Sequence, residues 1–332
     1  MAKNIYTTLK EFSKNKVDLD PTRLETARSS RDWLVTKIEN FENNDVFFPH
    51  IYKNENNVQM GSFARRTKIR PLDDIDFLVV FTGNGGHYNN NYNGEITISI
   101  PETASRLKRL TNDDSTLNSI KLLNKLKSFL SNIPQYSGAD IKRNQEAITL
   151  KLNSYDWNFD IVPAFITAPD NFERTYYLIP DGNGKWKKTD PRIDAKRATS
   201  INQQHNGEVL RIIRLVKAWH SRTVVPDIGS YLLENLILNY FESNWPATSD
   251  QSTLANVFHS LSQSIYRSCQ DPKGIQGDLN SLSYETKSRF SEAASKAYLC
   301  ALNAIDFVAA SDHEAAHAEW QTVFGGDFPE YG

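Results

Sequence analysis

The stretch GSFARRTKIRPLDDIDFLVVF at residues 61–81 decides the fold of this chain. It opens on a Gly-Ser pair and, after eleven intervening residues, reaches Asp74 and Asp76. The segment 75–81 is β-branched and aromatic, which favours a buried central strand. Side chains two residues apart in a strand point to the same face, so we expect the two aspartates to project together, away from an apolar core.

A third aspartate, Asp160, lies between apolar residues of a second predicted strand at 156–162. If the two strands are neighbours, three carboxylates converge, and each pair of like charges at 4 Å repels by about 4 kcal/mol at an effective dielectric near 20. Two Mg²⁺ ions would remove that cost, since magnesium takes oxygen ligands and a metal pair clamps both sides of an in-line phosphoryl displacement. Mn²⁺ is the alternative ion. The pattern therefore predicts metal-assisted phosphoryl transfer.

The Gly-Ser pair supplies the other half of this prediction. Gly61 allows close approach of the backbone to a phosphate, and Ser62 adds a hydroxyl donor. Taken alone, the Gly-Ser pair and the aspartates could each have a purely structural role. Asp73-Asp74, for example, could simply form a turn that leads into a strand. The combination is more specific because central strands rarely carry aspartate. We prefer Asp74 and Asp76 as the metal-binding pair because the apolar Phe77 follows them, and we expect Asp73 to point away from the metals.

Composition and charge narrow the class of partner. The 332 residues are 39% hydrophobic and 23% charged, with a net charge of −2, which favours a small anionic ligand over a long nucleic acid. We expect no stable nucleic-acid binding. No apolar run is long enough to span a membrane, and the N-terminus does not read as a secretory signal, so we expect a cytoplasmic protein. Cys269 and Cys300 have no metal-ligand spacing and are interpreted as free thiols.

The order of predicted elements indicates an α+β fold in two lobes. The first, residues 1–192 with an N-terminal helix, mixes helices and strands; the second, residues 193–332, is helical, and we expect the active site in a groove between them. We read the polar stretch 83–94 as a mobile hairpin loop and DGNGK at 181–185 as a second hairpin turn. Other expected strands are near 58–60 and 147–152, and expected helices cover 21–42, 103–131, 205–220, 229–242, 252–268, 283–311 and 313–324.

With these residues in place, the chain resembles the polymerase-β nucleotidyltransferase superfamily, whose pattern is Gly-Ser, a spacer, Asp-x-Asp in an apolar strand and a later aspartate. Within it, residues 61–81 resemble the bacterial cGAS/DncV-like nucleotidyltransferases, or CD-NTases, the cyclic-oligonucleotide synthases of anti-phage CBASS systems. LVKAWH at 215–220, GSYLLENL at 229–236 and EWQTVFGGDFP at 319–329 are similar to segments of the same family. The resemblance covers residues 20–329.

The resemblance implies a polymerase-β-like core, a helical C-terminal lobe like that of oligoadenylate synthase, and a role for each matching residue. Asp74 and Asp76 would bind both metals, and Asp160 the catalytic one. Glu234 is interpreted as structural. The residues implied in nucleotide binding are Gly61 and Ser62 at the donor phosphates, Lys217 reaching those phosphates, Ser230 assisting, and Tyr231 stacking on the donor base.

Some of these residues also have simpler readings. Lys217 could be a solvated lysine on a helix face, and Tyr231 a core aromatic. The basic run of Arg65, Arg66, Lys68 and Arg70 fits either phosphate binding or a solvated face.

The function implied is synthesis of a cyclic di- or trinucleotide second messenger from ATP and other nucleoside triphosphates, which a separate effector would sense. Activity is either constitutive or dependent on a regulatory protein partner. Two alternatives remain open. One is a template-independent nucleotidyltransferase acting on RNA or tRNA, which needs the same aspartates; the other is a non-catalytic nucleotide-binding protein of the same fold.

Overall fold

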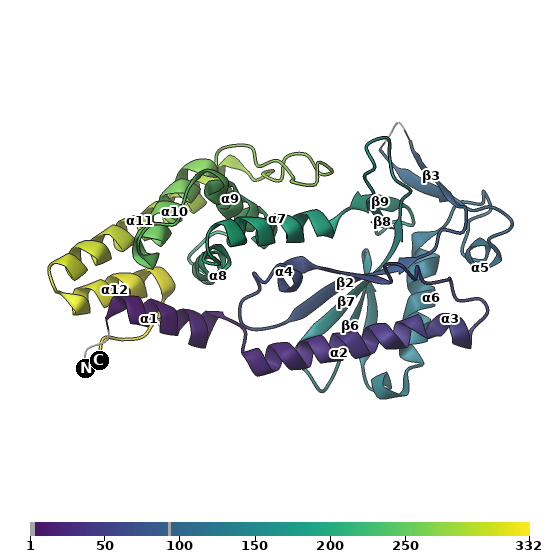
Figure 1. The fold of residues 1–332 in the computed structure, drawn as a ribbon, viewed down its shortest axis with the longest axis horizontal. Coiled ribbons are helices and arrows are strands. Elements are labelled where there is room, and N and C mark those ends of the chain that lie inside the picture. The colour runs from purple at the N-terminus through teal and green to yellow at the C-terminus, as the bar shows by residue number, and fades with distance from the viewer. Residues whose placement is uncertain (1–3, 92–93) are drawn as a thin grey trace. The chain divides into compact units, whose positions relative to one another are not determined.

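The computed structural model describes residues 4–91 and 94–332, which form two compact units (Figure 1). The sheet unit comprises Pro21–Ala64 and Leu72–Ile193. The helical unit comprises Met1–Asp20, Arg65–Pro71 and Asp194–Gly332. The lobes expected from the sequence, 1–192 and 193–332, differ from these units because they place the first two segments of the helical unit in the first lobe.

The reason for this difference is apolar packing by the N-terminal segment. Ile5, Leu9, Phe12 and Val17 are buried in the same hydrophobic core as the C-terminal helices. A fully buried side chain of this size contributes about 1.5–3 kcal/mol, so this segment is held by the helical unit rather than by the sheet. Sequence periodicity does not reveal which of two cores a short amphipathic helix joins.

One nine-stranded mixed sheet forms the centre of the sheet unit. Its main path runs β1-β2-β7-β8-β9-β4-β3, and β6 pairs with both β7 and β5. Only the β2–β7 pair is parallel among the described strand pairs. The strands are β1 (Asn57–Met60), β2 (Asp74–Phe81), β3 (His87–Asn90), β4 (Ile96–Ser99), β5 (Asp140–Asn144), β6 (Ala147–Lys151), β7 (Asn158–Ile166), β8 (Tyr177–Pro180) and β9 (Trp186–Thr189).

The sheet has an apolar face and a face that changes character along its strands. Ile75 and Phe77 of β2, with Phe159 of β7, are buried on one face. On the other face the first residues of β2 and β7 are polar, whereas the later Leu78 and Val162 are buried in a smaller apolar cluster. Aspartates therefore occupy one end of a face whose other end is core, as the alternation in the sequence predicts.

Within its described residues the sheet unit also contains the helices α2 (Pro21–Glu39), α3 (Phe41–Asn44), α4 (Gly61–Ala64), α5 (Ser105–Lys108) and α6 (Ser119–Ser131), and the 3₁₀-helix η2 (Pro134–Tyr136). The helix expected over 21–42 is confirmed, with a break before Phe41. The single helix expected over 103–131 is wrong, because a turn separates α5 from α6. Asn118 begins α6 by accepting hydrogen bonds from the backbone N–H groups of Ile120 and Lys121, a side-chain cap that starts a new helix.

The two expected hairpins are present, with one correction. Strands β8 and β9 flank the turn at 181–185, as predicted. The stretch 83–94, read as a loop, contains strand β3, which pairs with β4. All four side chains of β3 are exposed, so the strand lacks the alternation of apolar and polar residues that would have revealed it. Residues 92 and 93 of that stretch lie outside the described part of the chain.

The helical unit is built around one large hydrophobic core. Helices α10, α11 and α12 pack on one another in sequence order. Ser249, Ser283 and Asp312 cap these three helices by accepting backbone hydrogen bonds in their first turns. The helices of this unit are α1 (Ile5–Phe12), the π-helix η1 (Ser13–Val17), α7 (Pro191–Gln204, which starts in the sheet unit), α8 (Val209–His220), α9 (Ser230–Ser243), α10 (Asp250–Ser264), α11 (Tyr284–Ala309) and α12 (His313–Phe324).

Two further expectations concern the chain as a whole. No helix among the described residues is both long and apolar enough to cross a bilayer. Cys269 and Cys300 are buried free thiols. Burial raises the pKa of the Cys300 thiol to about 11, which keeps it in the unreactive protonated form at neutral pH.

Candidate active site

The predicted carboxylates lie on neighbouring strands in matching register. In the parallel pair β2–β7, Asp76 stands directly opposite Asp160, and Asp74 stands opposite Asn158. Adjacent strands are about 4.8 Å apart, so the backbones of Asp76 and Asp160 are at that separation. Asp74 shares the face of Asp76 because it lies two residues earlier on the same strand. The neighbouring strands that the carboxylate argument requires are therefore present.

Gly61 lies against the carboxylate of Asp76. Strand β1 ends at Met60, which pairs with Asp76, and the chain then enters the short helix α4 (Gly61–Ala64) that contains Ser62. A Cβ atom built on Gly61 would stand 1.9 Å from Oδ2 of Asp76, and the residue has φ = +72°. Glycine is required here on both counts, because a side chain would displace the carboxylate and this φ is strained for other residues. The Gly-Ser corner and the Asp-x-Asp strand are thus one structural unit.

The donor set suits a hard divalent cation. Asp74, Asp76 and Asp160 offer only carboxylate oxygens, which are the ligands that Mg²⁺ and Mn²⁺ take. The space kept open by Gly61 admits the Asp76 oxygen. Within residues 4–91 and 94–332, however, no three His, Cys, Asp or Glu side chains are already grouped as a metal site. The strand register and the carboxylate oxygens of these residues fit a divalent metal ion. Their side chains, however, are not gathered into a complete set of metal ligands.

Two polar neighbours of the aspartates come from strand β6. Thr149 stands opposite Asp160 and donates a hydrogen bond of 2.6 Å from its hydroxyl to Oδ1 of that carboxylate. Lys151 stands opposite Asn158 and is exposed. Our sequence prediction omitted both residues from the site. Part of the signal was available, because residues 148–151 alternate apolar and polar side chains, but nothing local to that strand indicates which neighbour it pairs with.

In the helical unit, Lys217 is engaged in a buried ion-pair cluster. Its ammonium group lies 2.8 Å from Oε1 of Glu234, and its side chain is 7% exposed. Arg65 binds the other oxygen of the same carboxylate, with Nε 2.9 Å from Oε2. One buried carboxylate therefore holds two cations that come from separate elements. The reading of Lys217 as a solvated surface lysine does not fit this burial.

The electrostatics of this cluster are favourable despite its burial. Desolvation opposes the charged form of Glu234, but Arg65 and Lys217 outweigh it and hold the pKa of the carboxyl below its ordinary value. For Arg65, burial likewise opposes the charge, and Glu234 outweighs it and raises the pKa of the guanidinium. Glu234 and Arg65 are therefore both charged at neutral pH, and the buried carboxylate is compensated within the cluster.

Tyr231 and Ser230 begin helix α9. The hydroxyl of Tyr231 lies 2.8 Å from Oδ1 of Asp194 and accepts a hydrogen bond from Lys273. Burial, with a contribution from Asp194, raises the pKa of this phenol. The Arg65 guanidinium stands 5.5 Å from the Tyr231 ring centre and the Lys273 ammonium 4.3 Å from it, both in cation–π geometry. Ser230 is exposed at the start of the helix.

The predicted site residues thus fall into two sets, one in each unit. Asp74, Asp76, Asp160, Gly61 and Ser62 belong to the sheet unit. The helical unit holds the second set, Lys217, Ser230 and Tyr231, together with Glu234, Arg65, Asp194 and Lys273. Among these, Asp194 and Lys273 had no sequence signal, since their contacts to Tyr231 join distant segments.

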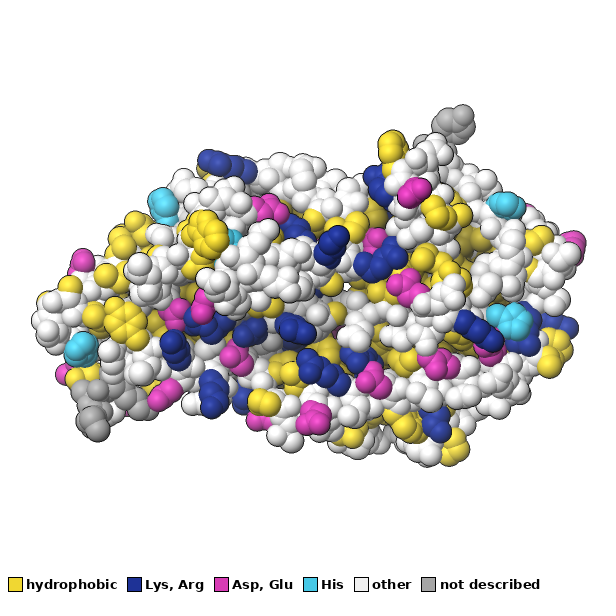
Figure 2. Space-filling view, viewed as in Figure 1, with side chains coloured by type: hydrophobic (Ala, Val, Ile, Leu, Met, Phe, Trp, Pro, Cys, Tyr) yellow, Lys and Arg dark blue, Asp and Glu magenta, His cyan; other side chains and the backbone are white. Residues whose placement is uncertain are grey.

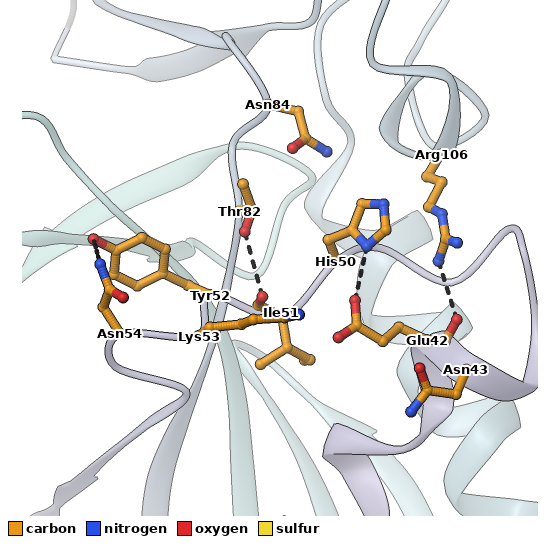
Figure 3. A pocket seen from close by; sticks show the side chains of 10 residues that line it. All are labelled: Glu42, Asn43, His50, Ile51, Tyr52, Lys53, Asn54, Thr82, Asn84 and Arg106. Carbon is orange, nitrogen blue, oxygen red and sulfur yellow. Dashed lines mark hydrogen bonds and ion pairs between the residues drawn. The ribbon is translucent and has the colours of Figure 1, made fainter.

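A separate polar cavity lies in the sheet unit (Figure 3). It is lined in part by Thr82, which directly follows β2, so it is at the opposite end of that strand from Asp74. Two of its lining groups are bound within the protein: Oε2 of Glu42 lies 2.7 Å from Nδ1 of His50, and Arg106 donates to the carbonyl of Phe48 at 2.7 Å. None of the three aspartates lines this cavity, so it is distinct from the carboxylate face.

Two characterised or named proteins are similar to this chain in sequence. No protein-family model matches the chain. A probable cyclic nucleotide synthase of Bacillus cereus (strain VD146) is 47% identical over 331 residues, covering 100% of this chain and 99% of the relative. The cyclic AMP-AMP-AMP synthase of Acinetobacter sp. (strain ATCC 27244 / 9458) is 27% identical over 205 residues, or 57% of this chain and 55% of that protein.

Solved structures share the fold. CdnC of E. coli MS115-1 with ATP superimposes with a TM-score of 0.71 at 17% identity, over 98% of both chains. DncV of Vibrio cholerae, a cyclic AMP-GMP synthase, does so with a TM-score of 0.71 at 13% identity, over 99% of this chain and 98% of that one. The α+β fold expected from the sequence is confirmed by these likenesses. Taken with the full-length relative from Bacillus cereus, they show that this nucleotidyltransferase belongs to the CD-NTase, or DncV-like, family of cyclic nucleotide synthases.

Proposed function

We propose that this enzyme makes a cyclic di- or trinucleotide from ATP and other nucleoside triphosphates. The observation that carries the proposal is the register of Asp76 opposite Asp160, with Gly61 held against the Asp76 carboxylate. That arrangement supports two-metal phosphodiester formation, and membership of a cyclic nucleotide synthase family supports a cyclic product. We propose further that the product acts as an anti-phage second messenger read by a separate effector.

In the proposed reaction, a ribose hydroxyl of the acceptor nucleotide attacks the α-phosphorus of the donor. A new O–P bond forms, the bond between the α-phosphorus and the bridging oxygen breaks, and pyrophosphate leaves. The hydroxyl proton leaves towards the carboxylate of Asp160. Two Mg²⁺ ions, held by Asp74, Asp76 and Asp160, would supply charge stabilisation at the attacking and leaving oxygens. Repetition of the step with the new chain end closes the ring.

Nucleotide binding is assigned to residues of both sets. The backbone at Gly61 and the hydroxyl of Ser62 would contact donor phosphates. Lys217, oriented by Glu234, would add a cation for the phosphates, and Ser230 a hydroxyl. Tyr231 would stack on the donor base.

The proposal is tested by incubating the purified chain with all four ribonucleotide triphosphates and Mg²⁺, treating with phosphatase, and identifying resistant species by mass spectrometry. We expect a resistant product whose mass gives its bases and ring size. The Asp74→Asn, Asp76→Asn double variant should make none. A dephosphorylated linear oligonucleotide, one water heavier than the ring, would contradict the cyclic assignment. Label that enters only RNA, in a parallel reaction with RNA present, would favour the RNA-directed alternative.

The same assay addresses regulation and the non-catalytic alternative. The structure of CdnC, which shares this fold, has been solved in complex with HORMA-deltaN. Dependence of the activity on a regulatory protein partner is therefore worth testing for this chain. A product formed by the chain alone would indicate constitutive activity. Calorimetric titration with a non-hydrolysable ATP analogue measures nucleotide binding directly. Binding of the analogue by a protein that forms no product in the assay would favour the non-catalytic nucleotide-binding alternative.

A further inference from the structure

A row of polar side chains crosses three adjacent strands of the sheet unit. Thr149 of β6 stands opposite Asp160 of β7, which stands opposite Asp76 of β2. Two members of this row are the proposed metal-binding carboxylates. The third, Thr149, is neutral and half-buried.

The contact between Thr149 and Asp160 is specific. The threonine hydroxyl donates to Oδ1 of the carboxylate over 2.6 Å, which is short enough for a charge-assisted hydrogen bond. A threonine in a strand has restricted rotation about χ1, so its hydroxyl is held in place by the backbone. The carboxylate of Asp160 is therefore oriented by a rigid donor on the neighbouring strand.

We propose that Thr149 is a positioning residue that fixes the rotamer of Asp160 for metal binding and for receipt of the acceptor proton. The hydrogen bond from Thr149 takes up one lone pair of Oδ1. The remaining lone pairs of the carboxylate, chiefly those of Oδ2, are then left for the metal ion and the acceptor proton. This inference rests on the proposed function, because it gives Thr149 a role through Asp160.

The test uses Thr149→Val, which keeps the β-branched shape and removes only the hydroxyl. Thr149→Ser, which keeps the donor, is the conservative variant. Thr97→Val is the matched control: Thr97 is half-buried in strand β4 of the same sheet, and no hydrogen bond from its hydroxyl is found within the described residues. Each variant is assayed for turnover, for binding of Mn²⁺ by electron paramagnetic resonance without nucleotide, and for thermal unfolding in EDTA.

We expect Thr149→Val to lower kcat by about tenfold to a hundredfold, the range for loss of a hydrogen bond to a charged group. Its KM for ATP should change little, because Thr149 is not expected to touch the nucleotide. The Mn²⁺ dissociation constant should rise by about tenfold, while unfolding in EDTA stays near that of Thr97→Val. Thr149→Ser should retain most of the activity and metal affinity.

Two outcomes overturn the inference. In one, Thr149→Val keeps the wild-type kcat and Mn²⁺ affinity. In the other, Thr149→Val and Thr149→Ser lose activity equally and both unfold early, which indicates a role in the strand rather than in orienting Asp160. Failure of the proposed function is distinguishable, because the wild-type chain would then make no phosphatase-resistant product while the Mn²⁺ comparison could still be read.

Discussion

At the scale of the residue, the close contact between Gly61 and Asp76 joins two parts of the motif. The Gly-Ser pair and the Asp-x-Asp strand were each visible as letters, and strand alternation correctly predicted that Asp74 and Asp76 share a face. What the letters could not reveal is that the glycine is needed for the carboxylate beside it, since that depends on the pairing of Met60 with Asp76 across β1 and β2.

This contact predicts a severe effect for Gly61→Ala. The added methyl group would displace the Asp76 carboxylate, and a shift of about 1 Å in a reacting group costs about a hundredfold in rate. We expect kcat to fall by at least that factor. The comparison is Gly207→Ala, where φ is +86° and no atom lies within 4 Å of the added Cβ. Both variants carry the backbone penalty of about 1–2 kcal/mol, but only the first should lose turnover. Equal activity of the two would contradict the assigned contact.

At the scale of the element, helices α8 and α9 are joined through Glu234. The carboxylate is 1% exposed and binds Lys217 of α8 and Arg65, which is 169 positions away in the sequence. The sequence pattern predicted both helices, and the family resemblance led to the interpretation of Glu234 as a structural residue. It could not predict the Arg65 contact, because pairing between such distant positions is set by the packing of the whole unit.

Glu234→Gln should therefore destabilise the helical unit. Removal of one partner from a buried ion pair leaves uncompensated charge and costs about 3–5 kcal/mol. The matched control is Glu292→Gln, an exposed position on α11, which should change the free energy of unfolding by no more than about 0.5 kcal/mol. Urea unfolding at pH 7 measures both. A small effect at Glu234 would mean that its two cations find other partners.

The same carboxylate gives a pH dependence with a defined sign. Its pKa in the folded chain is lowered, so its contribution to stability is fully present above the unfolded value of about 4.3 and is lost as the pH falls through the lower folded value. We expect the wild type to lose more unfolding free energy than Glu234→Gln between pH 5 and the lowest pH at which both fold. Parallel pH profiles for the two proteins would contradict this assignment.

At the scale of the whole molecule, charge separates the small-ligand function from the RNA-directed one. The net charge is −2, and acidic and basic side chains are interspersed over the face drawn in Figure 2. A protein that neutralised six to ten phosphates of a nucleic acid would lose about 10³–10⁵ in affinity between 50 and 200 mM salt. We expect only weak RNA binding by filter retention at low salt. Tight binding with that steep salt dependence would favour the RNA-directed alternative.

The central claim is that three aspartates catalyse ring closure, and the stoichiometry of pyrophosphate release tests it most directly. Formation of each phosphodiester bond releases one pyrophosphate. A ring has as many phosphodiester bonds as nucleotides, whereas a linear chain has one bond fewer, so ring formation releases more pyrophosphate per nucleotide. The measurement compares pyrophosphate released with nucleotide incorporated into product, for the wild type and for Asp160→Asn. We predict one pyrophosphate per incorporated nucleotide for the wild type and no release above background for the variant. A ratio below one with a retained 5′ triphosphate, or unchanged release by Asp160→Asn, would contradict the account.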